Sequence, residues 1–152
     1  MICVQYLRTA RFAFAISALL LCTLRAPPAF ADASTWCIYD ILLEAHAMAS
    51  RCGETLDAAG EQRFNALVAA ARRSMVENSA RTGKSPAELG ALLDKMEVQE
   101  KAHYDDRDLA FCKTSEYRDG VFMLKSLTSE KGYPGIMKSL QTRRNPEEGD
   151  CL

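Results

Sequence analysis

Hydrophobic residues recur at spacings of three and four along most of the chain after residue 31, and this period predicts α-helices rather than strands. The first clear segment runs from Trp36 to Cys52, and Gly53 directly after it is a natural left-handed helix stop. On a helical wheel the apolar positions of this segment form one continuous stripe: Cys37, Ile38, Ile41, Ala45, Met48 and Cys52, with Leu42 and Ala49 at its margin. We expect the stripe, with both cysteines, to face the core.

Two further helices are predicted in the middle of the chain. One runs from about residue 58 to residue 80, and either Thr55 or Asp57 is placed to cap it. The next begins at Ser85-Pro86-Ala87-Glu88, where serine at the N-cap, proline at the first helical position and glutamate at the third form a capping box. This helix is expected to extend to about His103.

The remainder of the chain predicts a fourth helix over residues 108–127, a turn at residues 132–135 and a short helix over residues 136–141. Residues 104–108 are polar and form a bend, a new helix N-terminus or the solvated middle of one long helix. Residues 143–152 form a polar tail. The predicted fold class is all-α: a small bundle of about four main helices over residues 32–142, stapled by disulfides.

Residues 1–31 have the parts of a secretory signal peptide. Arg8 and Arg11 precede an apolar stretch over residues 12–24, and Ala29-Phe30-Ala31 has the small-x-small form of a cleavage site. Thirteen apolar residues are well short of the roughly twenty that a membrane-spanning helix needs. We therefore expect cleavage after Ala31, export to the periplasm or full secretion, and no stable membrane anchor afterwards.

The charge of the exported part argues against nucleic-acid binding. Residues 32–152 carry 16 basic and 20 acidic side chains, a formal net charge of −4. Adjacent basic pairs occur only at Arg72-Arg73 and Arg143-Arg144, whereas nucleic-acid binding usually requires a concentrated basic surface.

Four cysteines remain after the predicted cleavage, an even number that is typical of disulfides in an oxidising compartment. Cys37 and Cys52 lie about 22 Å apart along one helix axis, whereas a disulfide needs Cα atoms within about 7 Å. The pairing is therefore Cys52–Cys112 with Cys37–Cys151, or the crossed alternative. The first is favoured because Cys52 and Cys112 lie in or near packed helices and the tail brings Cys151 to the start of the first helix.

No metal, haem or other cofactor is expected. His46 lies on the opposite side of the first helix from Cys37, so Cys37, His46 and Cys52 do not share one ion. Glu100 and His103 have the spacing of di-iron and di-manganese bundles, but those centres need a second Glu-x-x-His. Glu97, Glu100 and His103 are the residues of a metal-dependent alternative.

Clustered carboxylates at Asp105, Asp106 and Asp108 also raise the question of a calcium site. They lack the glycine and the distal glutamate of the twelve-residue EF-hand loop. A helix N-terminus rich in acids explains them more simply.

Surface recognition is the remaining function, and Trp36, Tyr39 and Leu43 share the far side of the first helix. If the bundle leaves that side uncovered, these residues form an interaction surface; otherwise the helix is buried all round. We expect a non-catalytic binding module of the cell envelope, with another protein or an envelope component as partner. The alternatives are a metal-dependent protein or enzyme that uses the Glu97, Glu100 and His103 face, and a periplasmic stress chaperone.

Overall fold

The computed structural model describes residues 34–142, and the predicted signal peptide and polar tail lie outside them. Five α-helices and two 3₁₀ helices make up the regular structure of this part of the chain, in the following order: α2 (Thr35–Arg51), α3 (Ala58–Glu77), η2 (Ser79–Thr82), α4 (Pro86–Asp105), η3 (Leu109–Lys113), α5 (Ser115–Leu127) and α6 (Gly132–Thr142). No strand occurs between residues 34 and 142, so the all-α prediction is confirmed.

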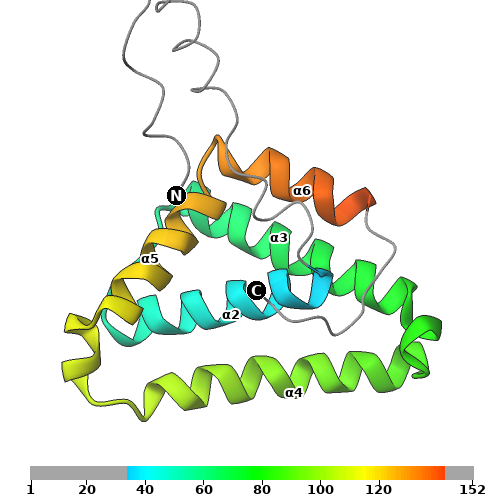
Figure 1. Ribbon diagram of the computed structural model, residues 1–152, viewed down its shortest axis with the longest axis horizontal. Helices are drawn as coiled ribbons and strands as arrows, with labels where there is room; N and C mark the ends of the chain where they lie inside the picture. Colours follow the sequence, from blue (N-terminus) through cyan, green and yellow to red (C-terminus); the bar gives the residue numbers. More distant parts are fainter. Residues whose placement is uncertain (1–33, 143–152) are drawn as a thin grey trace, which may run out of the picture. The chain divides into compact units, whose positions relative to one another are not determined.

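Helix α2 lies at the centre of the described helices and packs against α3, α4 and α5 (Figure 1). Ser34 caps it by accepting a hydrogen bond from the Cys37 amide over 3.2 Å. Its buried side chains extend well beyond the predicted stripe and include Thr35, Tyr39 and Ala47. The helix is buried around most of its circumference because neighbours cover it on several sides.

Helix α3 lies between α2 and α6 (Figure 1). Asp57, not Thr55, is its N-cap, and the Asp57 carboxylate accepts a hydrogen bond from the Gly60 amide at 2.6 Å. The connection from α2 to α3 is short, so the two helices run antiparallel. The end of α3 therefore lies beside the start of α2.

Helix α4 begins at the predicted capping box, which is confirmed. The Ser85 amide donates to the Glu88 carboxylate at 2.8 Å, and the Glu88 amide donates to the Ser85 hydroxyl at 3.3 Å. The helix ends at Asp105, so the polar stretch after it is a bend and not the middle of a longer helix.

The predicted fourth helix is two elements, η3 and α5, because Thr114 interrupts it. The Thr114 hydroxyl accepts a hydrogen bond from the Tyr117 amide at 3.2 Å and starts α5 there. Further along, a Cβ atom added to Gly120 would lie 2.6 Å from the Met48 sulfur. The glycine therefore permits a close approach between α5 and α2.

The predicted turn at residues 132–135 is wrong, since these residues form the first turn of α6. Pro134 is the third residue of that helix. The first four amide groups of a helix have no partner within it, so a proline there costs no helical hydrogen bond. Helix α6 consequently runs the full distance from Gly132 to Thr142 along α3.

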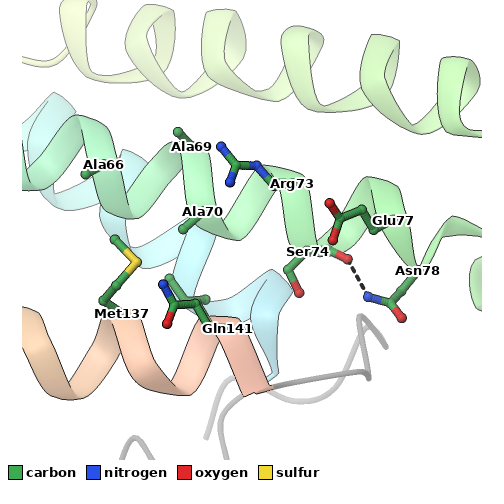
Figure 2. Close-up of a pocket in the computed structure, with 10 residues that line it drawn as sticks. Ala66, Ala69, Ala70, Arg73, Ser74, Glu77, Asn78, Met137 and Gln141 are labelled. Atoms are coloured by element: carbon green, nitrogen blue, oxygen red, sulfur yellow. Dashed lines mark hydrogen bonds between the residues drawn. The ribbon is translucent and has the colours of Figure 1, made fainter.

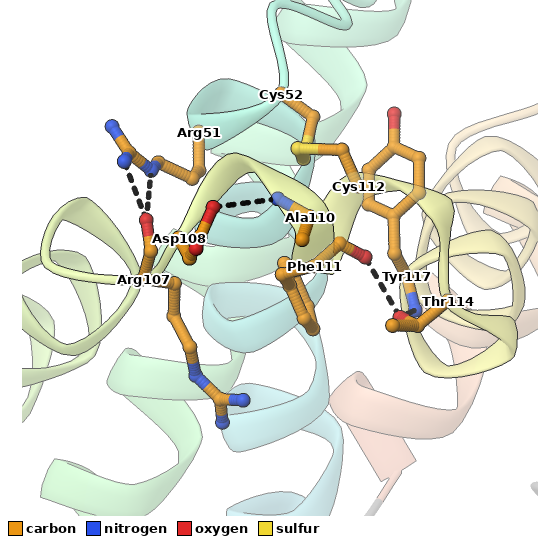
Figure 3. Close-up of a disulfide and its surroundings, with 9 residues drawn as sticks. All are labelled: Arg51, Cys52, Arg107, Asp108, Ala110, Phe111, Cys112, Thr114 and Tyr117. Carbon is orange, nitrogen blue, oxygen red and sulfur yellow. Dashed lines mark hydrogen bonds between the residues drawn. A yellow bond between two sulfur atoms is a disulfide. The ribbon is translucent and has the colours of Figure 1, made fainter.

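The preferred Cys52–Cys112 disulfide is confirmed, with Cα atoms 5.6 Å apart (Figure 3). Beside it, the Arg51 guanidinium donates hydrogen bonds to the Arg107 carbonyl, one of them over 2.9 Å from Nε. These contacts fix the end of α2 to the bend after α4 and to η3. A disulfide that closes a loop of this length typically stabilises a domain by about 2–4 kcal/mol.

Cys37 is also disulfide-bonded and fully buried. Its expected partner, Cys151, lies outside the described residues, so that pairing stays a prediction. Neither Cys52 nor Cys112 is available to Cys37, because they bond each other. The crossed pairing is therefore excluded.

Candidate functional site

A polar pocket of about 290 Å³ lies where α2, α4 and the start of α5 meet. We call it the acidic pocket, and its lining residues are Asp40, Glu44, Glu100, His103, Tyr104, Arg107 and Glu116. Asp40 and Glu44 are one helical turn apart on α2, and Glu100 with His103 and Tyr104 are one turn apart on α4. The helical period thus turns each group toward the same space.

One edge of the acidic pocket is fixed by hydrogen bonds and ring contacts. The buried Tyr104 hydroxyl donates to Glu44 at 2.7 Å, and burial together with this carboxylate raises the pKa of Tyr104. The Arg107 guanidinium lies 3.1 Å from His103 Nε2 and 3.8 Å from a Glu116 carboxylate oxygen. Its central carbon is also 5.4 Å from the centre of the Tyr104 ring, within cation–π range.

Three carboxylates line the acidic pocket from the two long helices, Asp40 and Glu44 from α2 and Glu100 from α4. Among residues 34–142, Asp40, Glu44 and Glu100 form no ion pair with a lysine or arginine. Burial, and then the charge of Glu44, raise the pKa of Asp40. Burial, and then Asp40 and Glu44, raise the pKa of Glu100, while His103 opposes this effect. The group therefore carries unneutralised negative charge in a partly desolvated place.

Glu97 does not join Glu100 and His103. Its carboxylate accepts hydrogen bonds from the Tyr39 hydroxyl at 2.5 Å and from Arg72 Nη1 at 3.2 Å. Burial and the nearby Glu97 raise the pKa of Tyr39. The structure thus divides the three residues of the metal-dependent alternative between two places on α4.

No three His, Cys, Asp or Glu side chains within the described range are grouped so that they could hold a metal ion. Two of the three clustered aspartates have structural roles, one at the end of α4 and one after it. Asp105 pairs with Lys101 one turn earlier, and Asp108 caps η3 by accepting from the Ala110 amide at 2.9 Å. Only Asp108 therefore matches the expected role at a helix N-terminus.

Trp36, Tyr39 and Leu43 do not form one exposed face. Tyr39 is fully buried, while Trp36 and Leu43 are half-buried. The cause is α4, which covers this side of α2 and supplies the Glu97 partner of Tyr39. Only Trp36 and Leu43 retain part of the surface that the sequence assigned to the three.

His46 is half-buried. Its ring stacks on Phe64 of α3 with centroids 4.1 Å apart, and Nε2 lies 3.3 Å from a Glu61 carboxylate oxygen. The histidine therefore belongs to the contact between α2 and α3 and not to the acidic pocket.

A second hollow, of about 850 Å³, lies between the C-terminal halves of α3 and α6 (Figure 2). We call it the α3–α6 groove, and its main lining residues are Ala66, Ala70, Arg73, Ser74, Met137 and Gln141. Alanines on α3 leave space that larger side chains would fill. Sequence reasoning missed this groove, because it depends on the approach of two helices far apart in the chain.

Sequence reasoning found only some of the residues that line the acidic pocket and missed Asp40 and Glu44. The spacing of Glu100 and His103 marks them in the sequence, and Asp40 and Glu44 are an equally regular acidic pair one turn apart on the first helix.

Comparisons with family models, with curated proteins and with solved structures found no match to this chain. None of the helices between residues 34 and 142 has the length and apolar character needed to cross a membrane.

Proposed function

We propose that the protein is an exported, non-catalytic binding module whose acidic pocket receives a positively charged group of its partner. The best-fitting group is a lysine or arginine side chain of another protein or envelope component. The observation that carries this proposal is the convergence of Asp40, Glu44 and Glu100 from two helices, where none of the three forms an ion pair with a lysine or arginine of the described residues 34–142.

The size of the acidic pocket favours a single side chain over a whole small molecule. Pockets for drug-sized ligands usually enclose about 300–1,000 Å³, and this one is at the lower limit with about 290 Å³. An ammonium or guanidinium group has several hydrogen-bond donors and tolerates a loose ring of acceptors, whereas a metal ion demands close and regular ligands. Asp40, Glu44 and Glu100 come from two helices and form such a loose ring, so they suit an ammonium or guanidinium group better than a metal ion.

Electrostatics gives the cation a favourable place and orientation. Burial, and then repulsion between neighbouring carboxylates, raise the pKa of Asp40 and Glu100, and a positive group beside them offsets both effects. Arg107 lines the same pocket and lies 3.8 Å from a Glu116 carboxylate oxygen, and its positive charge repels a second cation. The incoming group is thereby directed toward Asp40, Glu44 and Glu100.

The Cys52–Cys112 disulfide supports the exported part of the proposal, because structural disulfides persist in oxidising compartments. The pattern of residues 1–31 supports it from the sequence side. Mass spectrometry of the protein recovered from the periplasm or medium should find Asp32 as its first residue.

Binding is tested with a fluorescently labelled oligolysine peptide and the secreted protein, followed by fluorescence anisotropy at low and at physiological salt. The double variant Asp40→Asn/Glu100→Gln should weaken binding by roughly tenfold or more, because it removes two of the three carboxylates that face the cation. Binding should also weaken as the pH falls through the raised pKa values of these carboxyls.

The matched control is Asp119→Asn/Glu130→Gln, which removes the same charge from exposed positions outside the acidic pocket. It should change the dissociation constant by less than about twofold at physiological salt. If both double variants weaken binding equally, the peptide responds to net charge alone and the acidic pocket is not its site.

A further inference from the structure

Cys37 has a disulfide partner outside residues 34–142. It is disulfide-bonded, and the other two cysteines of the described range bond each other. The chain has six cysteines in total, so the candidates are Cys3, Cys22 and Cys151. Removal of residues 1–31 as predicted leaves Cys151 alone.

The helices bring the tail and Cys37 to one end of the bundle. The start of α2, the end of α3 and the end of α6 lie at the same end (Figure 1). Cys151 follows Thr142, the last residue of α6, by nine residues, which span up to about 30 Å when extended. This length allows Cys151 to lie well away from the end of α6, toward the start of α2.

The same end of the bundle contains the α3–α6 groove. Met137 and Gln141 from the last two turns of α6 line it, so the tail leaves the helix directly at the edge of the groove. Pro146 stops the helix from continuing through the tail, which favours an extended segment. An extended segment lies more readily in a shallow groove between two helices than a third helix does.

We propose that residues 143–152 cover the α3–α6 groove and are fixed there by a Cys37–Cys151 disulfide. The bond forms by exchange: the two thiols lose two protons and two electrons to a disulfide-bearing oxidant of the export compartment, which is released as two thiols. A dithiol reductant reverses the reaction and frees the tail.

The bond itself is tested by tryptic digestion of the secreted protein without reduction. Trypsin cuts after Arg51 and Arg144, so Cys37 and Cys52 fall on different peptides and Cys151 lies on residues 145–152. Peptide 32–51 should be linked to peptide 145–152, and peptide 52–63 to peptide 108–113. A link from Cys37 to Cys3 or Cys22, or a free Cys151, would overturn the proposal.

The position of the tail over the groove is tested by the rate at which dilute peroxide oxidises Met137, a half-buried residue of the groove. Met123 is the internal control, since it is also half-buried but lies on α5. Cys151→Ser, and a truncation after Thr142, should each raise the Met137 rate several-fold and leave the Met123 rate unchanged.

Two results of this methionine oxidation experiment would contradict the proposal. Equal Met137 rates in the native, Cys151→Ser and truncated proteins would show that the tail does not cover the groove. Protection that depends on protein concentration and survives truncation would place a second copy there instead. Neither result bears on the acidic pocket, which is lined by α2, α4 and the start of α5 and not by α3 or α6.

Discussion

Helices α2 and α4 have similar lengths but very different surroundings. Nine of the 17 residues of α2 are buried, whereas α4 buries only Leu89, Leu93 and Tyr104 among its 20. Packing on several sides therefore stabilises α2. Helix α4 has more polar contacts: the capping box at its start, and the ion pairs that Arg72 of α3 forms with Asp94 and Glu97.

The acidic pocket lies along the contact between these two helices. Asp40 and Glu44 extend from a helix that is otherwise core, and Glu100 extends from one that is mostly solvated. A rigid buried helix therefore supplies part of the site and an exposed helix the rest. Binding sites gain accuracy when their side chains stand on such well-packed elements.

The largest expected effect comes from a cavity in α2. Leu42 is fully buried, and Leu42→Ala should lower the free energy of unfolding by about 2–5 kcal/mol. Val98 on α4 is 69% exposed, and Val98→Ala should change it by less than about 0.5 kcal/mol. Chemical denaturation of both variants measures the difference, and similar losses would show that α4 is packed as tightly as α2.

Removing the N-cap serine should have a smaller effect on stability, and the first turns of α4 and α2 should respond differently. Ser85→Ala removes the capping box of α4 and should cost about 0.5–2 kcal/mol, with faster amide hydrogen exchange in the first turn. Glu88→Gln should have little effect, because glutamine also completes a capping box. Ser34→Ala at the start of α2 is the matched comparison, and exchange there should change less because packing holds that turn. Equal exchange at both starts would contradict this.

The smallest effect concerns the carboxylates between the helices. Their folded pKa values are raised, so the folded state binds protons more tightly than the unfolded state, and stability is lost as the pH rises through those values. Asp40→Asn/Glu100→Gln should therefore stabilise the protein at pH 7, by less than about 1 kcal/mol because solvent screens these half-exposed groups. The gain should shrink below about pH 4, near the ordinary pKa of both side chains, and be lost by about pH 3, where both carboxyls are largely protonated in either state. Thermal denaturation across this range checks it, and a gain that persists at pH 3 would rule out the electrostatic cause.

Much of the fold follows from local sequence. The three-and-four spacing locates the helices, and the Ser85 to Glu88 motif starts α4 at the expected residue. Helix geometry alone prevents a bond between Cys37 and Cys52, and the structure pairs Cys52 with Cys112. These features depend on residues close in the chain or on a fixed rise per residue.

The remaining features depend on which helices become neighbours. The covering of Tyr39 by α4, the stacking of His46 on Phe64 and the separation of Glu97 from Glu100 are tertiary events that no helical wheel contains. The start of α6 illustrates a local failure of a different kind. Gly132 and Pro134 are typical turn residues, but both are tolerated in a first helical turn, where the amide groups need no helical partner.

The Cys52–Cys112 bond has a consequence for proteolysis. Helices α3 and α4 and the η2 segment between them all lie inside the covalent loop that this bond closes. Gly83, with φ of 70°, ends η2 in an exposed connection where a protease would cut most readily. A single cut there leaves both fragments joined through the disulfide, so the nicked domain keeps its parts together and can remain folded until the bond is reduced.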